Sequence, residues 1–393
     1  MNSHIGRKYT SSFLAAFTLI GGLLLISPSC EKEPDLIIPT DGYEWPDNNR
    51  DYWPTEGWRT ASMEDHQMDA SKMAIADDFA ANDPLARALL VIKDGYLVFE
   101  KYYGEGGANE STDLWSVTKS YTSAVVGLLM DNGTIQSTSQ LMADLMPAYP
   151  EFNEITLHHV LTMKTGLSWA ESGPLWVEWA FSDDWVASAL ARGQVNEPGE
   201  KFYYSSGNSH FLTSLVYYAG HIKPGGLAKQ HLFDPMGVPF DTLDHPIVYN
   251  TWSDYQLPMY QTWRQDTRGI ETASFGLYMR ARDMAKFGFL YLNRGRWEDE
   301  QLLSESWVKA SVKEHVRGVY GRYSYGYQWF ITLVAGEAAF LASGYGGQII
   351  GVVPSRDLVV ILIYEAEDPV HPETGSAHDD MHLFDLVVES VVE

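Results

Sequence analysis

The sequence predicts an α+β fold in which one antiparallel sheet is formed from both ends of the chain and a mostly helical lobe is inserted between them. Two pairs of strand-like runs, each pair interrupted by a turn signal, occur near opposite ends of the chain. Between these pairs, apolar residues recur with the period of a helix. A chain of 393 residues is longer than a single hydrophobic core usually supports, so we expect two packed lobes.

The first 29 residues have the pattern of a signal peptide. Arg7 and Lys8 precede an apolar run over residues 13–26, which is too short for a comfortable membrane span but suits a signal-peptide core. Cys30, the only cysteine, follows this run, and the pattern resembles a bacterial lipoprotein signal in which Cys30 carries the lipid. We therefore expect a lipid-anchored protein of the bacterial cell envelope, on its periplasmic or outer surface. A plain secretory signal with an unmodified thiol is the alternative.

Residues 30–60 are predicted to form a tether. They are rich in Pro, Asp, Asn and Trp and have no periodicity, so we expect order only where their aromatic side chains contact the body of the protein. The body spans residues 61–393, with the helical lobe over roughly residues 130–310. Strands are predicted at 88–92, 96–102, 348–353 and 358–364, and helices at 116–130, 185–191, 210–219, 281–292 and 382–392.

The helix that begins at Ser116 contains the first chemical signal. Lys119 follows one helical turn later, so both side chains lie on one face. A serine hydroxyl is a weak nucleophile until a base removes its proton, and a buried lysine with a lowered pKa can be that base. The alternative interpretation is a helix cap followed by a solvated lysine. Ser306 and Lys309 have the same spacing without companion motifs, and we assign them no chemistry.

Two further motifs strengthen the functional interpretation. They are PGEKFYYSSGN at residues 198–208 and ASGYGGQ at residues 342–348. With Ser116 and Lys119, they resemble the three motifs of the penicillin-recognising serine hydrolases, and most of all the class C β-lactamase-like branch with its esterases and 6-aminohexanoate-dimer hydrolases. Residues 155–169 and 282–297 also resemble family segments. The resemblance implies a β-lactamase/transpeptidase-like fold.

The resemblance also implies roles for individual residues. Ser116 would be the acylated nucleophile, Lys119 its base, and Tyr204 the group that exchanges protons with the nucleophile and the leaving group. The backbone amides of Ser116 and Gln348 would form the oxyanion hole. Ser206 falls where class C β-lactamases have asparagine, and Tyr345-Gly346-Gly347 falls where they have Lys-Thr-Gly; these four residues would bind substrate.

Three segments imitate these motifs. Lys164-Thr165-Gly166 spells the third motif but precedes the tyrosine motif, and Tyr291-Leu292-Asn293 spells the second but ends a helix; we interpret both as structural. Ser206-Gly207-Asn208 is similar to the S-D-N motif of class A enzymes, so Ser206 remains an alternative proton shuttle to Tyr204.

Composition limits the remaining functions. A net charge of -25 disfavours nucleic-acid binding, and a single cysteine excludes a thiolate zinc site and a disulfide framework. We interpret the cluster of His371, His378, Asp379, Asp380 and His382 as a solvated surface and expect neither metal nor cofactor. The sequence therefore predicts a serine hydrolase of a small-molecule or short-peptide amide or ester. The alternatives are a non-catalytic, ligand-binding envelope lipoprotein, and a peptidase or β-lactamase of the same fold.

Overall fold

The structure is a computed structural model that describes residues 42–47, 49–244, 259–366 and 380–392. The expected signal peptide, Cys30 and the first part of the expected tether lie outside these residues, as do His371 and His378. The part of the expected tether that is described lies against the domain. Its aromatic side chains pack on the main core, and Arg50 forms an ion pair with Asp357 at the turn between two central strands; the aromatic residues are Tyr43, Trp45, Trp53 and Trp58.

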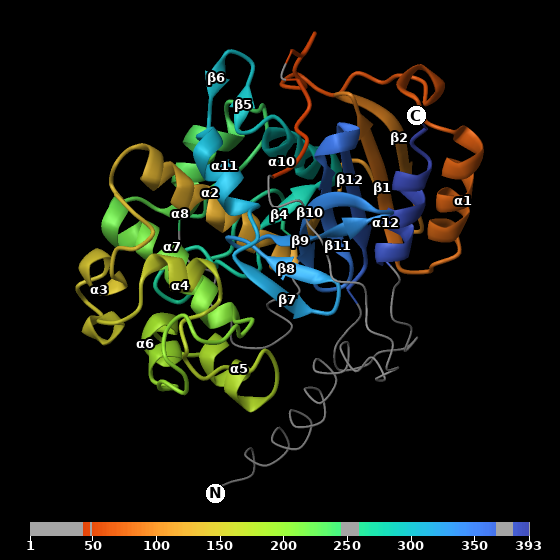
Figure 1. Ribbon diagram of the computed structural model, residues 1–393. Coiled ribbons are helices and arrows are strands. Elements are labelled where there is room, and N and C mark those ends of the chain that lie inside the picture. Colours follow the sequence, from red (N-terminus) through yellow and green to blue (C-terminus); the bar gives the residue numbers. More distant parts are fainter. Residues whose placement is uncertain (1–41, 48, 245–258, 367–379, 393) are drawn as a thin grey trace, which may run out of the picture.

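Eight of the described strands form one antiparallel sheet, in the order β2-β1-β12-β11-β10-β9-β8-β7 (Figure 1). β1 (Ala86–Lys93) pairs with β12 (Leu358–Tyr364), so segments from the two ends of the chain are neighbours inside the sheet. The predicted α+β fold, with a sheet formed from both chain ends, is confirmed. The other strands are β2 (Tyr96–Tyr102), β7 (Val316–Tyr320), β8 (Tyr323–Tyr325), β9 (Phe330–Val334), β10 (Glu337–Gly344) and β11 (Gln348–Val353).

The sequence did not predict the four strands from β7 to β10. β8 has only three residues, and β7 is an edge strand with exposed Arg317 and Gly318 in its middle. β10 consists largely of alanine, glycine and serine, which have low strand propensity. These strands form because each pairs with its neighbour in the sheet. Pairing of this kind produces little apolar periodicity in the sequence of the strand itself.

Helices cover both faces of the sheet (Figure 1). α1 (Ala70–Ala81) and α12 (Asp380–Glu389) pack on one face, as predicted for the C-terminal helix. α10 (Ala281–Leu292) packs on the other face, against β11 and β12. A Cβ at Gly288 would lie 2.6 Å from a methyl group of Val359, so glycine permits this close approach. α10 therefore covers the sheet, although it falls within the range expected for the helical lobe, whereas α11 (Glu305–Ser311) packs against α2 (Thr118–Asp131) of that lobe.

The helical lobe surrounds α2 (Thr118–Asp131), whose residues from Thr118 to Leu129 are all buried. It contains α3 (Met142–Leu145), α4 (Leu157–Leu161), α5 (Pro174–Ala180), α6 (Trp185–Leu190), α7 (Ser206–Gly220) and α8 (Pro224–Ala228), with short turns η4 (Pro150–Phe152) and η5 (Lys229–Phe233). In the rest of the described chain are η2 (Glu64–His66), η6 (Pro354–Arg356), α11 (Glu305–Ser311), and the pairs β3 (Ser111–Asp113) with β4 (Tyr278–Arg280) and β5 (Arg296–Trp297) with β6 (Glu300–Gln301). Over the described ranges, no helix has the length and apolarity needed to cross a bilayer.

Candidate active site

Ser116 lies in a strained turn at the start of the central helix. The turn η3 (Trp115–Val117) leads directly into α2, and Trp115 has φ +47°, a left-handed conformation that costs free energy for a bulky residue. Asp113 stabilises the turn, because one of its carboxylate oxygens accepts hydrogen bonds from the amides of Trp115 at 2.8 Å and Gly276 at 2.9 Å. These contacts fix Ser116 beside the N-terminus of α2.

Lys119 is buried, with 1% of its surface exposed, and its amine lies next to Ser116. The Nζ atom donates to Ser116 Oγ at 2.9 Å and to the carbonyl of Ser274 at 3.1 Å, and it lies 3.4 Å from Ser206 Oγ. Burial lowers the pKa of Lys119 to about 8, while the nearby Glu171 carboxylate acts in the opposite direction. A substantial fraction of this lysine is therefore neutral near pH 7 to 8 and can accept a proton.

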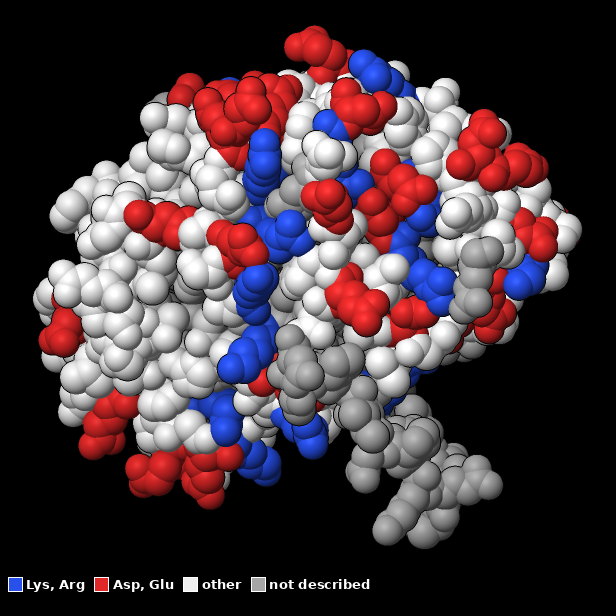
Figure 2. Space-filling model, turned by 45° about the horizontal axis from the view of Figure 1, so that its top comes forward, with Lys and Arg blue, Asp and Glu red and all other residues white. Residues whose placement is uncertain are grey.

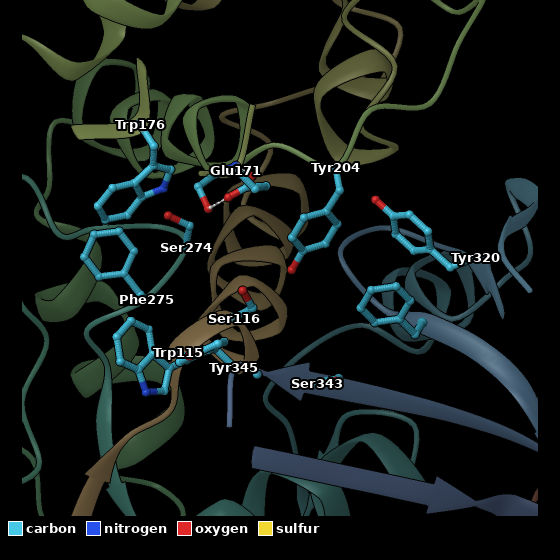
Figure 3. Close-up of a pocket in the computed structure, with 13 residues that line it drawn as sticks. Trp115, Ser116, Glu171, Trp176, Tyr204, Ser274, Phe275, Tyr320, Ser343 and Tyr345 are labelled. Atoms are coloured by element: carbon cyan, nitrogen blue, oxygen red, sulfur yellow. Dashed lines mark hydrogen bonds between the residues drawn. The ribbon is translucent and has the colours of Figure 1, made fainter. Parts of the chain in front are cut away.

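Tyr204 also lies beside Ser116. Its hydroxyl points toward Ser116 (Figure 3) and hydrogen-bonds with it, and its ring centroid lies 4.8 Å from Lys119 Nζ. Burial raises the pKa of Tyr204, so this hydroxyl carries its proton at neutral pH and can donate it. The structure thus brings together the three residues for which the sequence predicted proton transfer and nucleophilic attack.

The sequence analysis did not find Glu171, which lies in the loop before α5. One oxygen of its carboxylate accepts the indole N–H of Trp169 at 2.8 Å and the backbone N–H of Ser206; the other accepts the Ser206 hydroxyl at 2.9 Å. The proton of the Ser206 hydroxyl is thus directed to Glu171, and the lone pairs of the Ser206 hydroxyl oxygen face Lys119. Asn208 points away, to Thr165 Oγ1 at 2.7 Å. A single acid in a loop gives no sequence pattern, so only the fold could reveal it.

Of the residues expected from the third motif, Tyr345 lines the pocket. The pocket is lined by Ser343, Gly344 and Tyr345, at the end of β10. A Cβ on Gly344 would lie 2.3 Å from the Leu114 carbonyl oxygen and 3.3 Å from the Ser116 amide nitrogen, so this glycine lets the strand end reach the nucleophile.

Gly346, Gly347 and Gln348 do not line the pocket in the described chain, which corrects the expected position of the motif. Cβ atoms on Gly346 and Gly347 would meet Ala366 and Tyr364, and Gln348 is fully buried. The Gln348 side chain bonds to main-chain atoms of Tyr345 and Tyr364. It therefore supports the turn behind the pocket.

The pocket around Ser116 has a volume of about 360 Å³ and mostly aromatic walls. Figure 3 shows Trp115, Trp176 and Phe275 on one side, Tyr204 and Tyr320 on the other, and Glu171 between them. The remaining lining residues are Ser116, Ser206, Ser274, Phe330, Ser343, Gly344 and Tyr345.

Other candidate groups lie away from this pocket. Arg264 is 1% exposed and donates to the Tyr278 hydroxyl at 2.7 Å, and Arg268 pairs with Asp184 at 2.6 Å. Lys309 pairs with Glu305 at 2.6 Å. Lys164-Thr165-Gly166 forms a turn with Gly166 at φ +77°, and Tyr291-Leu292-Asn293 ends α10 in the core. In the part of the chain that the structure describes, no group of three or more His, Cys, Asp or Glu side chains could hold a metal.

The fold and the arrangement of serine, lysine and tyrosine define a protein of the β-lactamase/transpeptidase-like class, whose members are typically serine hydrolases of amide or ester bonds. A family model described as Beta-lactamase matches residues 77–380, and the chain belongs to this family.

Solved structures with the same fold include three hydrolase and penicillin-binding relatives of low sequence identity. One is a Bacillus anthracis protein assigned as a 6-aminohexanoate-dimer hydrolase, at 18% identity and a TM-score of 0.64 over 95% of this chain and 91% of that one. Another is a penicillin-binding protein homologue from Caulobacter crescentus, at 17% identity and a TM-score of 0.61 over 82% of this chain and 98% of that one. The third is EstCE1, a hydrolase with promiscuous acyltransferase activity, at 12% identity and a TM-score of 0.61 over 82% of this chain and 98% of that one. At these identities the likeness concerns the fold alone.

Proposed function

We propose that the protein is a serine hydrolase that cleaves an ester or amide through an acyl-enzyme on Ser116. The observation that supports this most directly is the 2.9 Å contact between Ser116 Oγ, which lines the pocket, and the amine of the buried Lys119. The pKa of Lys119, lowered to about 8 by burial, allows its neutral amine to take the serine proton.

In the proposed acylation step, Ser116 Oγ forms a bond to the substrate carbonyl carbon and its proton passes to Lys119 Nζ. The bond to the leaving group then breaks, the Tyr204 hydroxyl protonates that group, and Tyr204 recovers a proton from Lys119. Water attacks the acyl-enzyme by the same transfers in reverse, which regenerates Ser116. We place Tyr204 in this role and not Ser206, because the Ser206 hydroxyl donates to Glu171.

The developing oxyanion needs two N–H donors. We propose the amides of Ser116 and Tyr345, in place of Ser116 and Gln348. Tyr345 directly follows Gly344, whose Cβ position lies 3.3 Å from the Ser116 amide nitrogen, and it lines the pocket.

The experiment that tests the proposal is active-site labelling with a fluorophosphonate, followed by peptide mapping. The wild type should be labelled on Ser116, and Ser116→Ala should remove the label. The matched control is Ser306→Ala, because Ser306 has the same spacing to a lysine but lies on α11. This variant should be labelled fully. Full labelling of Ser116→Ala would overturn the assignment and favour a ligand-binding protein.

We propose that the enzyme is a poor β-lactamase. Where class C enzymes have the lysine of Lys-Thr-Gly to bind the β-lactam carboxylate, the described pocket has no basic lining residue, and Arg264 and Arg268 are engaged elsewhere. A charge-assisted contact contributes about 1.5 to 3 kcal/mol, so its absence lowers kcat/KM roughly ten- to a hundredfold. Turnover of nitrocefin should fall below that of p-nitrophenyl acetate and butyrate; the reverse order would contradict this proposal.

We also propose that Cys30 is lipidated and anchors the protein to an envelope membrane. The support is the apolar run over residues 13–26 followed by the only cysteine. A Cys30→Ser variant should leave the membrane fraction or remain unprocessed. Recovery of the wild type as a soluble, lipid-free protein would overturn this anchor.

A further inference from the structure

One carboxylate holds the turn that carries the nucleophile. An oxygen of Asp113 accepts the backbone N–H of Trp115 at 2.8 Å and that of Gly276 at 2.9 Å. Trp115 directly precedes Ser116, and Gly276 closely follows Ser274, whose carbonyl accepts a hydrogen bond from the base. The same oxygen therefore connects the segment of the nucleophile with the segment that orients the base.

Asp113 differs from the acidic residues that lie at the surface. On the face in Figure 2 such residues form clusters in contact with water. Asp113 is partly buried, and burial of an ionised carboxylate costs free energy unless other groups stabilise it. Burial raises the pKa of Asp113, and the charge of Arg264 and a hydrogen bond from the Tyr278 hydroxyl act in the opposite direction. Arg264 also donates to the Tyr278 hydroxyl at 2.7 Å, so both residues favour the ionised form of Asp113.

The turn needs such a contact because Trp115 has an unfavourable backbone conformation. Its φ of +47° is costly for a residue with a bulky side chain. The hydrogen bond from the Trp115 amide to Asp113 opposes relaxation to a negative φ. Such a relaxation would rotate the peptide plane between Trp115 and Ser116.

The N–H of Ser116 lies in this peptide plane. The amides before and after it are bonded inside the protein, that of Trp115 to Asp113 and that of Val117 to the Leu114 carbonyl at 3.1 Å. The amide between them is the one that the proposed function assigns to the oxyanion. Its direction therefore depends on the conformation of Trp115.

We propose that Asp113 is a positioning residue, which holds the strained turn and thereby keeps the Ser116 amide directed at the oxyanion. Arg264 and Tyr278 assist by stabilising its carboxylate. The inference rests on the proposed function, since an oxyanion forms only if Ser116 attacks a carbonyl. Among the described residues Asp113 is not part of the pocket lining, so substrate binding does not depend on its side chain.

The first test separates kcat from KM. Asp113→Ala should lower kcat on p-nitrophenyl acetate by about 10²- to 10³-fold, the usual effect of losing an oxyanion-hole donor. KM should change little, because acylation and deacylation both form an oxyanion and slow down together. Asp113→Asn keeps an acceptor oxygen in the same place, so its kcat should be about tenfold above that of Asp113→Ala. Wild-type kcat in Asp113→Ala, or an equal loss in both variants, would overturn the inference.

A second measurement tests whether the effect passes through Trp115. Glycine adopts a positive φ without steric cost, so a Trp115→Gly chain needs the carboxylate less. The loss of kcat caused by Asp113→Ala should therefore be about tenfold smaller in the Trp115→Gly background than in the wild type. Because each loss is measured within one background, the missing indole does not enter the comparison. Equal losses in the two backgrounds would overturn the inference.

Asp69→Ala is the matched control. Asp69 also accepts two backbone amides, those of Ser71 at 2.8 Å and Lys72 at 3.3 Å, but it caps α1, which packs on the face of the sheet opposite α10. The variant should lower the free energy of unfolding and leave kcat within about twofold of the wild type. A fall in kcat as large as that of Asp113→Ala would assign the effect to a general loss of structure and overturn the inference.

Two milder variants decide the outcome if Asp113→Ala does not fold. Asp113→Asn and Tyr278→Phe weaken the contact with the turn without emptying the site, so each should lower kcat about tenfold at an unchanged KM. Wild-type kcat in both would overturn the inference while Ser116 is still labelled by the fluorophosphonate. If the wild type hydrolyses no ester and Ser116 takes no label, the proposed function fails, and the inference fails with it.

Discussion

Two buried lysines allow the active site to be compared with a structural junction of the same molecule. Lys119 is 1% exposed and Lys286 is 4% exposed, and burial lowers the pKa of each. Lys286 Nζ donates to three backbone carbonyls, those of Thr55 at 3.1 Å, Met236 at 2.9 Å and Gly237 at 3.0 Å. Lys119 instead contacts one carbonyl and the hydroxyls of two serines.

The difference shows that burial and a lowered pKa do not by themselves indicate catalysis. A carbonyl oxygen can only accept a hydrogen bond, so the amine of Lys286 has no proton to take from its partners. Its role is to join the N-terminal segment to α10 and to the loop after η5. A serine hydroxyl can also donate, so neutral Lys119 can take a proton from Ser116. The chemistry of the partner therefore separates the two lysines.

The comparison is tested most strongly by removing each lysine. Lys119→Ala should lower kcat/KM on p-nitrophenyl acetate by about 10²- to 10⁴-fold, because the general base is lost. Lys286→Met should leave kcat/KM of the folded protein within about twofold, but it should lower the free energy of unfolding by about 1 to 3 kcal/mol, because buried carbonyls lose their donor. A catalytic defect in Lys286→Met without loss of stability would contradict this division.

The second prediction concerns Tyr204, the partner of Lys119 in proton transfer. Tyr204→Phe should lower kcat by about 10²- to 10³-fold, because the leaving group loses its acid. The Lys119→Ala/Tyr204→Phe double variant should be little worse than the worse single variant, since both residues act in one proton-transfer unit. Tyr204→Phe combined with Lys286→Met should instead show additive effects. Activity near wild type in Tyr204→Phe would transfer the proton role to Ser206.

The sequence predicted the elements that have strong local patterns. The hairpins formed by β1 with β2 and by β11 with β12 have apolar runs and turn residues, and the helices α2 and α10 have clear periodicity and end signals. The β-lactamase-like fold and family followed from three motifs in order, and both are confirmed.

The parts that the sequence did not predict depend on long-range geometry. Glu171 reaches Ser206 across 35 residues, and Ser274 offers a backbone carbonyl to Lys119 across 155 residues. Of the third motif, placed at residues 345–347, Tyr345 lines the pocket as expected, but Gly346 and Gly347 do not. Only the close approach of Gly344 to the Ser116 turn reveals where the strand meets the nucleophile. No local pattern records such an approach.

A buried acid near the active-site loop provides the third prediction. Glu271 is 1% exposed, burial raises its pKa to about 7, and one of its oxygens has no hydrogen-bond partner in the described chain. Between about pH 4.5 and 7 the folded protein holds a proton that the unfolded chain has lost, so stability falls as pH rises through this range. One pKa unit corresponds to about 1.4 kcal/mol, so the loss is on the order of 3 kcal/mol.

Glu271→Gln should remove this part of the pH dependence and raise the free energy of unfolding at pH 8, as measured by urea denaturation at several pH values. Glu178→Gln, which changes an exposed acid, should leave the slope as it is in the wild type. A slope that persists in Glu271→Gln would assign the effect to another group.

The fourth and smallest effect concerns the pH profile, and it separates the two lysines once more. Because Lys119 must be neutral to act as a base, kcat/KM on p-nitrophenyl acetate should rise about tenfold per pH unit below pH 8 and level off above it. The Glu171 carboxylate raises the pKa of Lys119, so Glu171→Gln should move this limb to lower pH, whereas Lys286→Met and Glu178→Gln should not move it. An uncharged ester is required here, since a cationic substrate would itself offset the carboxylate. If the rising part of the pH profile stays in place or moves to higher pH in Glu171→Gln, the base that the profile reports is not Lys119 in contact with Glu171. The hydroxyl partners of Lys119 would then no longer distinguish Lys119 from Lys286.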